Sequence, residues 1–176
     1  MFKKIALGLV GLIIVAGGAL FVMNGSDNYD ATKYNATVTD GMNVGSQMSF
    51  SLPDQFDKKH TLDDDTKTLI LSFAKATGHT VKDFLVAQND DNYLSDKNAM
   101  FIADISPMPT VIRNTFALPD LKKSSYPVLL IYDKTIAAQI KNDTKADKIA
   151  VVTLENGTIT DTKYITTADE LKTILN

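Results

Sequence analysis

The sequence predicts an α/β domain with three layers, α/β/α, and a mixed central sheet, placed behind an N-terminal transmembrane helix. Three observations lead to this prediction: an apolar run opens the chain, short apolar strands alternate with helices between residues 67 and 132, and a strand hairpin followed by a helix closes it. Strand–helix–strand units need parallel crossovers, whereas a terminal hairpin adds antiparallel strands. The sheet is therefore expected to be mixed.

The first element is the apolar run from Ile5 to Met23, which contains no charged or polar side chain. As a helix it would be about 28 Å long, close to the ~30 Å hydrocarbon core of a bilayer. Lys3 and Lys4 precede it and the acidic residues begin at Asp27. The positive-inside rule then predicts a single-pass protein of the cytoplasmic membrane, with its C-terminal part extracytoplasmic, which is periplasmic in a Gram-negative cell.

A cleaved signal peptide is the alternative reading of this run, and Gly17 and Ala19 could supply its small-residue cleavage site. Cleavage after Ala19 would leave four large apolar residues exposed, which favours an uncleaved anchor. A lipid-modified cysteine is excluded because the chain contains no cysteine.

Residues 24–46 are rich in Asn, Asp, Thr, Gly and Ser, which is typical of a flexible tether. We therefore divide the chain into an anchor at 1–23, a tether at 24–46 and one folded domain at 47–176.

The domain is expected to open with a strand at 48–52, where apolar and polar residues alternate. A turn at Pro53-Asp54 leads to a small hairpin or edge strand at 55–62. The apolar run at 67–73 is typical of a strand covered on both faces. The spacing of Val81, Phe84 and Leu85 predicts a helix over 79–86.

The second half is expected to continue with a buried strand at 99–105. Pro107 and Pro109 mark the start of a helix that Pro119 ends. Its inner face is expected to carry the apolar side chains of Met108, Ile112 and Phe116, or alternatively those of Val111 and Thr115.

Two further buried strands are predicted at 127–132 and 149–154, and the stretch 133–147 between them fits either a helix or an edge strand. Asn156-Gly157 is a strong hairpin signal into a last strand at 158–165. Thr167 and Glu170 form a capping box for the closing helix.

Composition excludes several functions. Without cysteine the chain can form no disulfide, thiolate metal site or sulfur nucleophile. The formal net charge is −3, and the part after Met23 carries −5 because Lys3 and Lys4 precede it. Arg113 is the only arginine. An acidic chain with one arginine is not expected to bind nucleic acid.

The element order and several short motifs together resemble the thioredoxin-like superfamily, especially its peroxiredoxin and extracytoplasmic thioredoxin branches. Residues 45–62 resemble the opening strand and turn of those branches. Residues 69–73 resemble the central strand before the active-site loop, and Tyr126-Pro127-Val128 resembles the family's cis-proline turn facing that loop. Residues 156–176 resemble the terminal hairpin and helix.

The resemblance fails at the two cysteines of the active-site loop. Thr77-Gly78-His79-Thr80 resembles a Cys-Gly-His-Cys motif with threonine in both sulfur positions, although counting from Phe73 places the cysteines at residues 78 and 81 instead. In either register no sulfur is present. A threonine needs a positioned base to act as a nucleophile, so we interpret Thr77 or Thr80 as a helix N-cap and expect no catalytic residue.

No cofactor or metal site is expected. His60 and His79 are the only histidines, fewer than a histidine metal site normally uses. No phosphate-cradling glycine-rich loop follows a strand.

These observations predict a membrane-tethered thioredoxin-like module that is redox-inactive and binds a protein, peptide or small ligand. The resemblance implies a groove between the active-site loop and the proline turn. Arg113 is a candidate contact for an anion or partner. The alternatives are a non-thiol oxidoreductase and a structural subunit of an envelope complex. The groove would be lined by Thr77, Gly78, His79, Thr80, Tyr126 and Pro127.

Overall fold

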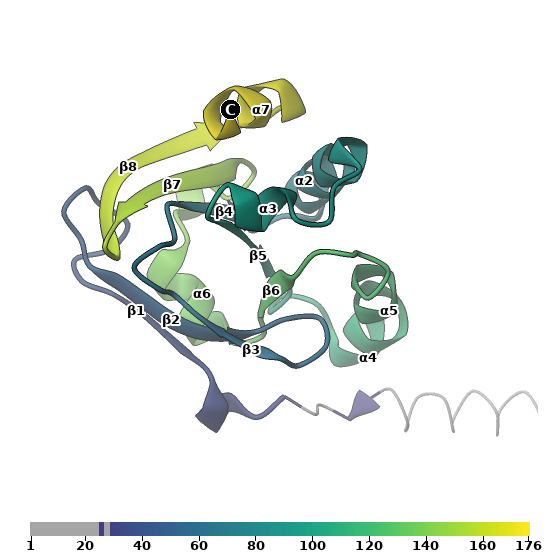
Figure 1. Cartoon of the computed structure of the whole chain (residues 1–176). Coiled ribbons are helices and arrows are strands. Elements are labelled where there is room, and N and C mark those ends of the chain that lie inside the picture. The colour runs from purple at the N-terminus through teal and green to yellow at the C-terminus, as the bar shows by residue number, and fades with distance from the viewer. Residues whose placement is uncertain (1–24, 27–28) are drawn as a thin grey trace, which may run out of the picture.

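The computed structural model describes residues 25–26 and 29–176 (Figure 1). The predicted membrane anchor, Ile5 to Met23, lies outside these residues. Within the described part of the chain, no helix is both long and apolar enough to cross a membrane.

A five-stranded mixed sheet forms the centre of the fold, in the order β6-β5-β4-β7-β8. Strands β4, β5 and β6 run parallel, while β7 is antiparallel to β4 and to β8. The prediction of a mixed sheet is confirmed. The five strands are β4 (Thr68–Ser72), β5 (Ala99–Asp104), β6 (Val128–Ile131), β7 (Ile149–Glu155) and β8 (Thr158–Ile165).

One face of this sheet is covered by helices. Helices α2 (Lys75–Gln88) and α7 (Ala168–Leu175) bury Val81, Phe84 and Leu171 against it. The short helix α3 (Tyr93–Asp96) adds Leu94 to the same core cluster. Because the apolar side chains of α2 and α7 recur at helical spacing, each helix presents one continuous stripe to the sheet.

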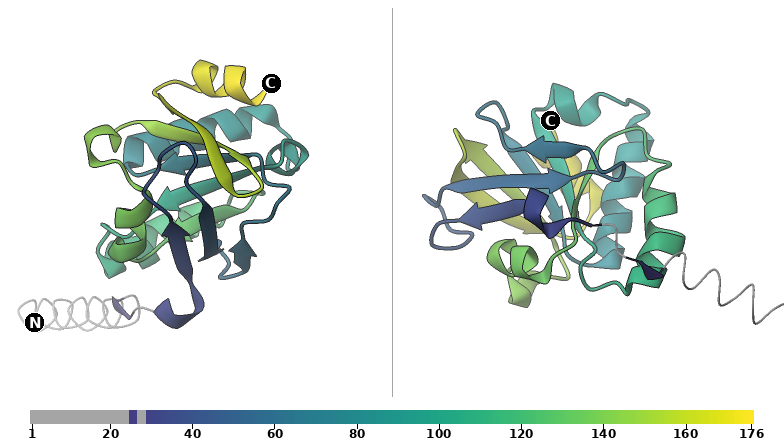
Figure 2. Two further views of the ribbon diagram at one scale, coloured as in Figure 1. Left: turned by 90° about the vertical axis from the view of Figure 1, so that its left-hand side faces the viewer. Right: turned by 90° about the horizontal axis from the view of Figure 1, so that it is seen from below.

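The other face is covered by helix α6 (Lys134–Ile140) and by a second, three-stranded sheet (Figure 2). This small antiparallel sheet has the order β1-β2-β3, and Phe50 and Leu52 of β2 pack with Ile136 of α6 in the second core cluster. The third layer is therefore part helix and part sheet, so the predicted α/β/α layering is correct only in part. The strands are β1 (Asn35–Val38), β2 (Met48–Pro53) and β3 (Lys59–Thr61).

Strand β1 begins within the range expected to be a tether. It pairs antiparallel with β2, and Ala36 is buried beneath the pair. A short 3-10 helix, η1 (Ala31–Lys33), precedes it, and Tyr34 is also buried. Folded structure therefore begins well before residue 47. Although this stretch is polar, Tyr34 and Ala36 are buried and β1 pairs with β2.

The helix predicted after Pro107 and Pro109 begins at Thr110, as expected, but it does not end at Pro119. It continues as α4 (Thr110–Ile112), a π-helical segment η2 (Arg113–Ala117) and α5 (Leu118–Leu121). Proline has no N–H to bond the carbonyl one turn earlier, and the widened π turn lies in the turn before it.

This π turn also changes which side chains face inward. Ile112 and Phe116 are 46% and 64% exposed, so the predicted inner face of this helix is wrong at both positions. Thr115, from the alternative set, is also exposed and Val111 is half-buried. Arg113 takes the inward position instead and is buried.

Three further segments can be compared with the predictions from the sequence. The ambiguous stretch 133–147 contains α6 and a 3-10 turn, η3 (Asp143–Lys145). Asn156 and Gly157 both have positive φ, as a tight two-residue hairpin requires. Thr167 and Glu170 form the predicted capping box of α7.

Candidate functional site

The threonines of the resembled cysteine loop lie inside helix α2 and do not cap it. The N-cap is Ala74, so the helix begins at Lys75, earlier than predicted. The Thr77 hydroxyl donates to the Ala74 carbonyl (2.8 Å) and lies 2.8 Å from the Ser72 hydroxyl. Thr80 donates to the Ala76 carbonyl (3.2 Å). Both hydroxyls donate to backbone carbonyls in the first two turns of the helix. The interpretation of Thr77 or Thr80 as the N-cap is therefore wrong.

Tyr126 and Pro127 lie at the other end of the sheet. Residues 74–80 follow the carboxyl end of β4, whereas Tyr126 and Pro127 precede the amino end of the parallel strand β6, and no described peptide bond is cis. The strand that begins beside α2 is β7, since Ile149 pairs with Ser72. It is preceded by Lys148. The six predicted groove residues are therefore not brought together.

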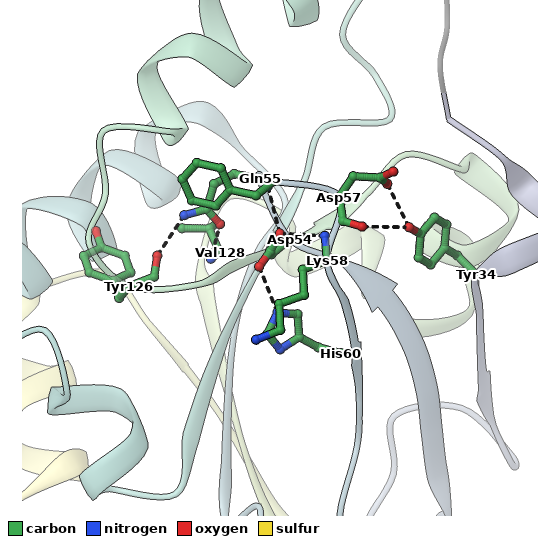
Figure 3. A network of polar contacts seen from close by, with 9 residues as sticks. Tyr34, Asp54, Gln55, Asp57, Lys58, His60, Tyr126 and Val128 are labelled. Carbon is green, nitrogen blue, oxygen red and sulfur yellow. Dashed lines mark hydrogen bonds and ion pairs between the residues drawn. The ribbon is translucent and has the colours of Figure 1, made fainter.

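Tyr126 and Val128 are instead joined by the buried side chain of Gln55 (Figure 3). Its amide Nε2 donates to the Tyr126 carbonyl (2.9 Å), and its Oε1 accepts from the Val128 N–H (2.8 Å). Asp54 beside it forms a β-bridge to Leu129. The turn after β2 thus closes the edge of the central sheet and joins the two sheets.

Asp54 stabilises the same turn. Its Oδ1 accepts from the amides of Phe56 (2.8 Å) and Lys58 (3.0 Å), and its Oδ2 lies 2.9 Å from His60 Nε2 (Figure 3). Burial alone would raise the pKa of Asp54. The hydrogen bonds from His60 and from the two amides outweigh it, so the pKa of this carboxyl lies below its usual range.

A pH dependence of folding follows from this shift. A depressed folded-state pKa contributes stability that is present above the unfolded value of about 3.9 and is lost as the pH falls through the lower folded value. We expect Asp54→Asn to reduce the loss of unfolding free energy between pH 5 and pH 3, measured by urea denaturation. Asp64→Asn, at an exposed carboxylate, is the control and should leave that loss unchanged. Equal loss in the wild type and in Asp54→Asn would contradict this role.

A depression with a volume of about 630 Å³ lies at the carboxyl ends of β5 and β6. Ligands of open α/β sheets bind at this end of the strands, and the volume is in the range of small-molecule sites. Its walls come from the residues just after each strand and from the start of α4. The lining residues are Tyr29, Ala31, Ser106, Pro107, Met108, Pro109, Thr110, Arg113, Tyr132, Asp133 and Lys134.

At this depression the Arg113 guanidinium packs on a stack of aromatic rings. The guanidinium carbon lies 4.8 Å from the Tyr132 ring centroid, and Tyr29 stacks on Tyr132 at 4.7 Å and on Tyr34 at 5.5 Å. The Tyr34 hydroxyl donates to Asp57 Oδ1 (2.8 Å). Burial, followed by this bond to a carboxylate, raises the pKa of Tyr34 to about 12. Tyr34 therefore stays neutral at physiological pH.

The carboxylates near the depression bond to their own loops. Asp133 Oδ1 accepts from the amide and hydroxyl of Thr135, and Asp104 Oδ1 accepts from the Ser106 amide. Lys134 is exposed at the rim. A buried guanidinium in a low-dielectric setting exerts a stronger field than an exposed charge. Arg113 and Lys134 give the lining of this depression two basic side chains.

Of the residues in this depression, the sequence singled out only Arg113 as a site residue. Tyr29 lies in the presumed tether, and Tyr132 ends a strand-like run. The usable signal was positional: Ser106 comes directly after one predicted parallel strand and Tyr132 ends another, and ligand sites collect at these strand ends.

No group of three or more potential metal-ligating side chains occurs among the described residues. His60 is paired with Asp54, and Asp63 accepts from the amide and hydroxyl of Thr66. Neither is arranged as part of a metal site.

No family model matches the sequence, and no curated protein matches it either. Among solved structures, a candidate protein disulfide isomerase from Bacteroides thetaiotaomicron has a TM-score of 0.52 and 16% identity, covering 80% of this chain and 89% of its own. Peroxidoxin BcpB from Mycobacterium tuberculosis gives 0.49 and 16%, covering 76% and 94%. StoA from Bacillus subtilis gives 0.49 and 14%, covering 73% and 96%.

The similarity to the first of these structures and the strand order define the class: the chain has a thioredoxin-like fold. It contains no cysteine. At this level of identity the likeness extends to the fold alone, so the function has to be argued from the site.

Proposed function

We propose that this protein is a membrane-tethered, extracytoplasmic binding module that recognises a carboxylate-bearing ligand in the depression around Arg113. The observation that carries the proposal is the buried arginine, stacked on Tyr132 at the carboxyl edge of the sheet. The apolar run from Ile5 to Met23 supplies the tether, as the sequence predicts.

The chemistry of the depression supports a carboxylate in particular. Arginine presents donors in a planar fork that matches a carboxylate, and stacking on an aromatic ring holds that fork in one orientation. Ser106 and Thr110 lie in the same wall, and Lys134 adds positive charge at the rim.

Thiol–disulfide and peroxidase chemistry based on cysteine is excluded by the sequence. The residues at the start of α2 do not replace it. Thr77 is buried and donates to its own backbone, while the side chain of His79 is exposed. A binding function needs no such nucleophile.

Isothermal titration calorimetry of the full chain in detergent micelles tests the proposal. Two probes separate the sources of the carboxylate: succinate, and an acetylated peptide with two adjacent aspartates. We expect at least one of them to bind, more weakly as salt is added. Binding of the peptide alone would identify a protein segment as the ligand. Binding of neither would overturn the proposal.

Lys134→Gln should weaken that binding by up to about fivefold, since an exposed ion pair contributes at most ~1 kcal/mol. Lys163→Gln is the matched control. Lys163 is an exposed lysine on β8 that already pairs with Asp161. Equal effects of the two substitutions would place the ligand outside the depression.

A further inference from the structure

A second surface, formed by α4 and η2, carries two exposed apolar side chains. Ile112 is 46% exposed and Phe116 is 64% exposed, four residues further along the same continuous helix. The burial of Arg113 turns this pair outward. We propose that Ile112 and Phe116 insert into the lipid surface at the boundary between headgroups and acyl chains. This proposal rests on the membrane tether of the proposed function.

The start of the described chain lies against the same helix, on the face that carries Val111 and Asn114. Asn114 Nδ2 donates to the Ser26 carbonyl (2.9 Å), and Gly25 lies beside Val111. Figures 1 and 2 show residues 25–26 next to α4. The described chain thus meets the domain at this helix.

Chain length then limits how far the helix can lie from the bilayer. Ser26 is the third residue after Met23, the last residue of the apolar run. Even fully extended, this stretch spans at most about 11 Å. If the run spans the bilayer, Ser26 lies within or just above the headgroup layer. Because Asn114 bonds Ser26, the helix that carries Ile112 and Phe116 lies near the same level.

The charge of this helix fits a lipid surface better than the charge of the whole domain does. The exposed basic residues of the segment 110–123 are Lys122 and Lys123, against one acidic residue, Asp120, which pairs with Lys82 and Lys123, whereas the chain after Met23 carries −5. Lys122 and Lys123 are exposed just after α5. Basic residues beside exposed apolar ones are typical of helices that lie on anionic membranes.

Because the chain has no cysteine, a single introduced cysteine can carry an environment-sensitive fluorophore at one known position. The full chain would be reconstituted in vesicles of phosphatidylcholine and phosphatidylglycerol that contain a nitroxide-labelled quencher lipid. We would compare Phe116→Cys with Val44→Cys, which labels an exposed apolar site in the β1–β2 loop. Ile14→Cys, within the apolar run, reports on the tether itself.

We expect quenching at residues 14 and 116 and several-fold less at residue 44. Quenching at 14 without quenching at 116 would overturn the docking and leave the tether intact. A blue-shifted but unquenched probe at 116 would show that the chain's own residues 1–24 cover this face, which also overturns it. Absence of quenching at both positions would refute tether and docking together. Equal quenching at 44 and 116 would contradict a specific face.

Discussion

Replacing Gln55 with alanine is expected to lower the free energy of unfolding by about 3 kcal/mol. The substitution leaves the Val128 N–H and the Tyr126 carbonyl without their side-chain partner, and both residues are buried. Each buried polar group left unsatisfied costs about 1–3 kcal/mol. Because this amide joins the turn after β2 to the edge of the central sheet, the two sheets should also separate more readily. Urea denaturation followed by circular dichroism measures the change.

Gln47→Ala is the matched control for this experiment. Gln47 makes the same kind of bonds, but its side chain is exposed: its Nε2 donates to the Asn156 carbonyl and its Oε1 accepts from the Thr158 hydroxyl. Water can replace those bonds, so a change within about 0.5 kcal/mol is expected. If both variants lost the same stability, the buried amide would not be the reason.

Replacing Arg113 with lysine is expected to weaken carboxylate binding by about 10- to 100-fold. Lysine keeps the positive charge but loses the planar fork and the stacking on Tyr132. Hydrogen bonds to charged groups contribute about 1.5–3 kcal/mol, which corresponds to this range. Calorimetry with succinate and with the aspartate peptide would measure it, and thermal unfolding would show that the variant is folded.

Unchanged affinity in a folded Arg113→Lys protein would remove Arg113 from the ligand contacts. Should that variant fail to fold, Lys134→Gln keeps the test decisive, because Lys134 is exposed and its replacement does not disturb the core.

The sequence predicts the strands and their mixed arrangement because buried strands leave short apolar runs and the terminal hairpin has an unambiguous turn. It predicts less about the helices. The helix through Pro119 continues because the chain widens into a π turn, and this turn exchanges Phe116 for Arg113 on the inner face. A prediction from residue spacing assumes a regular helix, so it assigns the wrong side chains to the buried face of this helix.

The site was predictable only in part, for a topological reason. Tyr126 and Pro127 open a parallel edge strand, whereas the segment beside α2 comes from β7. Sequence order alone does not show which strand neighbours β4, so the proline was placed at the wrong end of the sheet. Neither Tyr29 nor Tyr34 is predicted as a site residue, because the polar composition of residues 24–46 indicates a tether. In the structure their rings stack at the depression.

We propose that the carboxylate ligand binds at the carboxyl edge of β5 and β6 and not at the loop that begins α2. Backbone amide chemical shifts of the full chain, followed while the aspartate peptide is added, test it most directly. The account predicts that the largest shifts fall on residues 104–113 and 132–134, with little change at 74–80. Shifts centred on 74–80, or the absence of any localised shift, would contradict it.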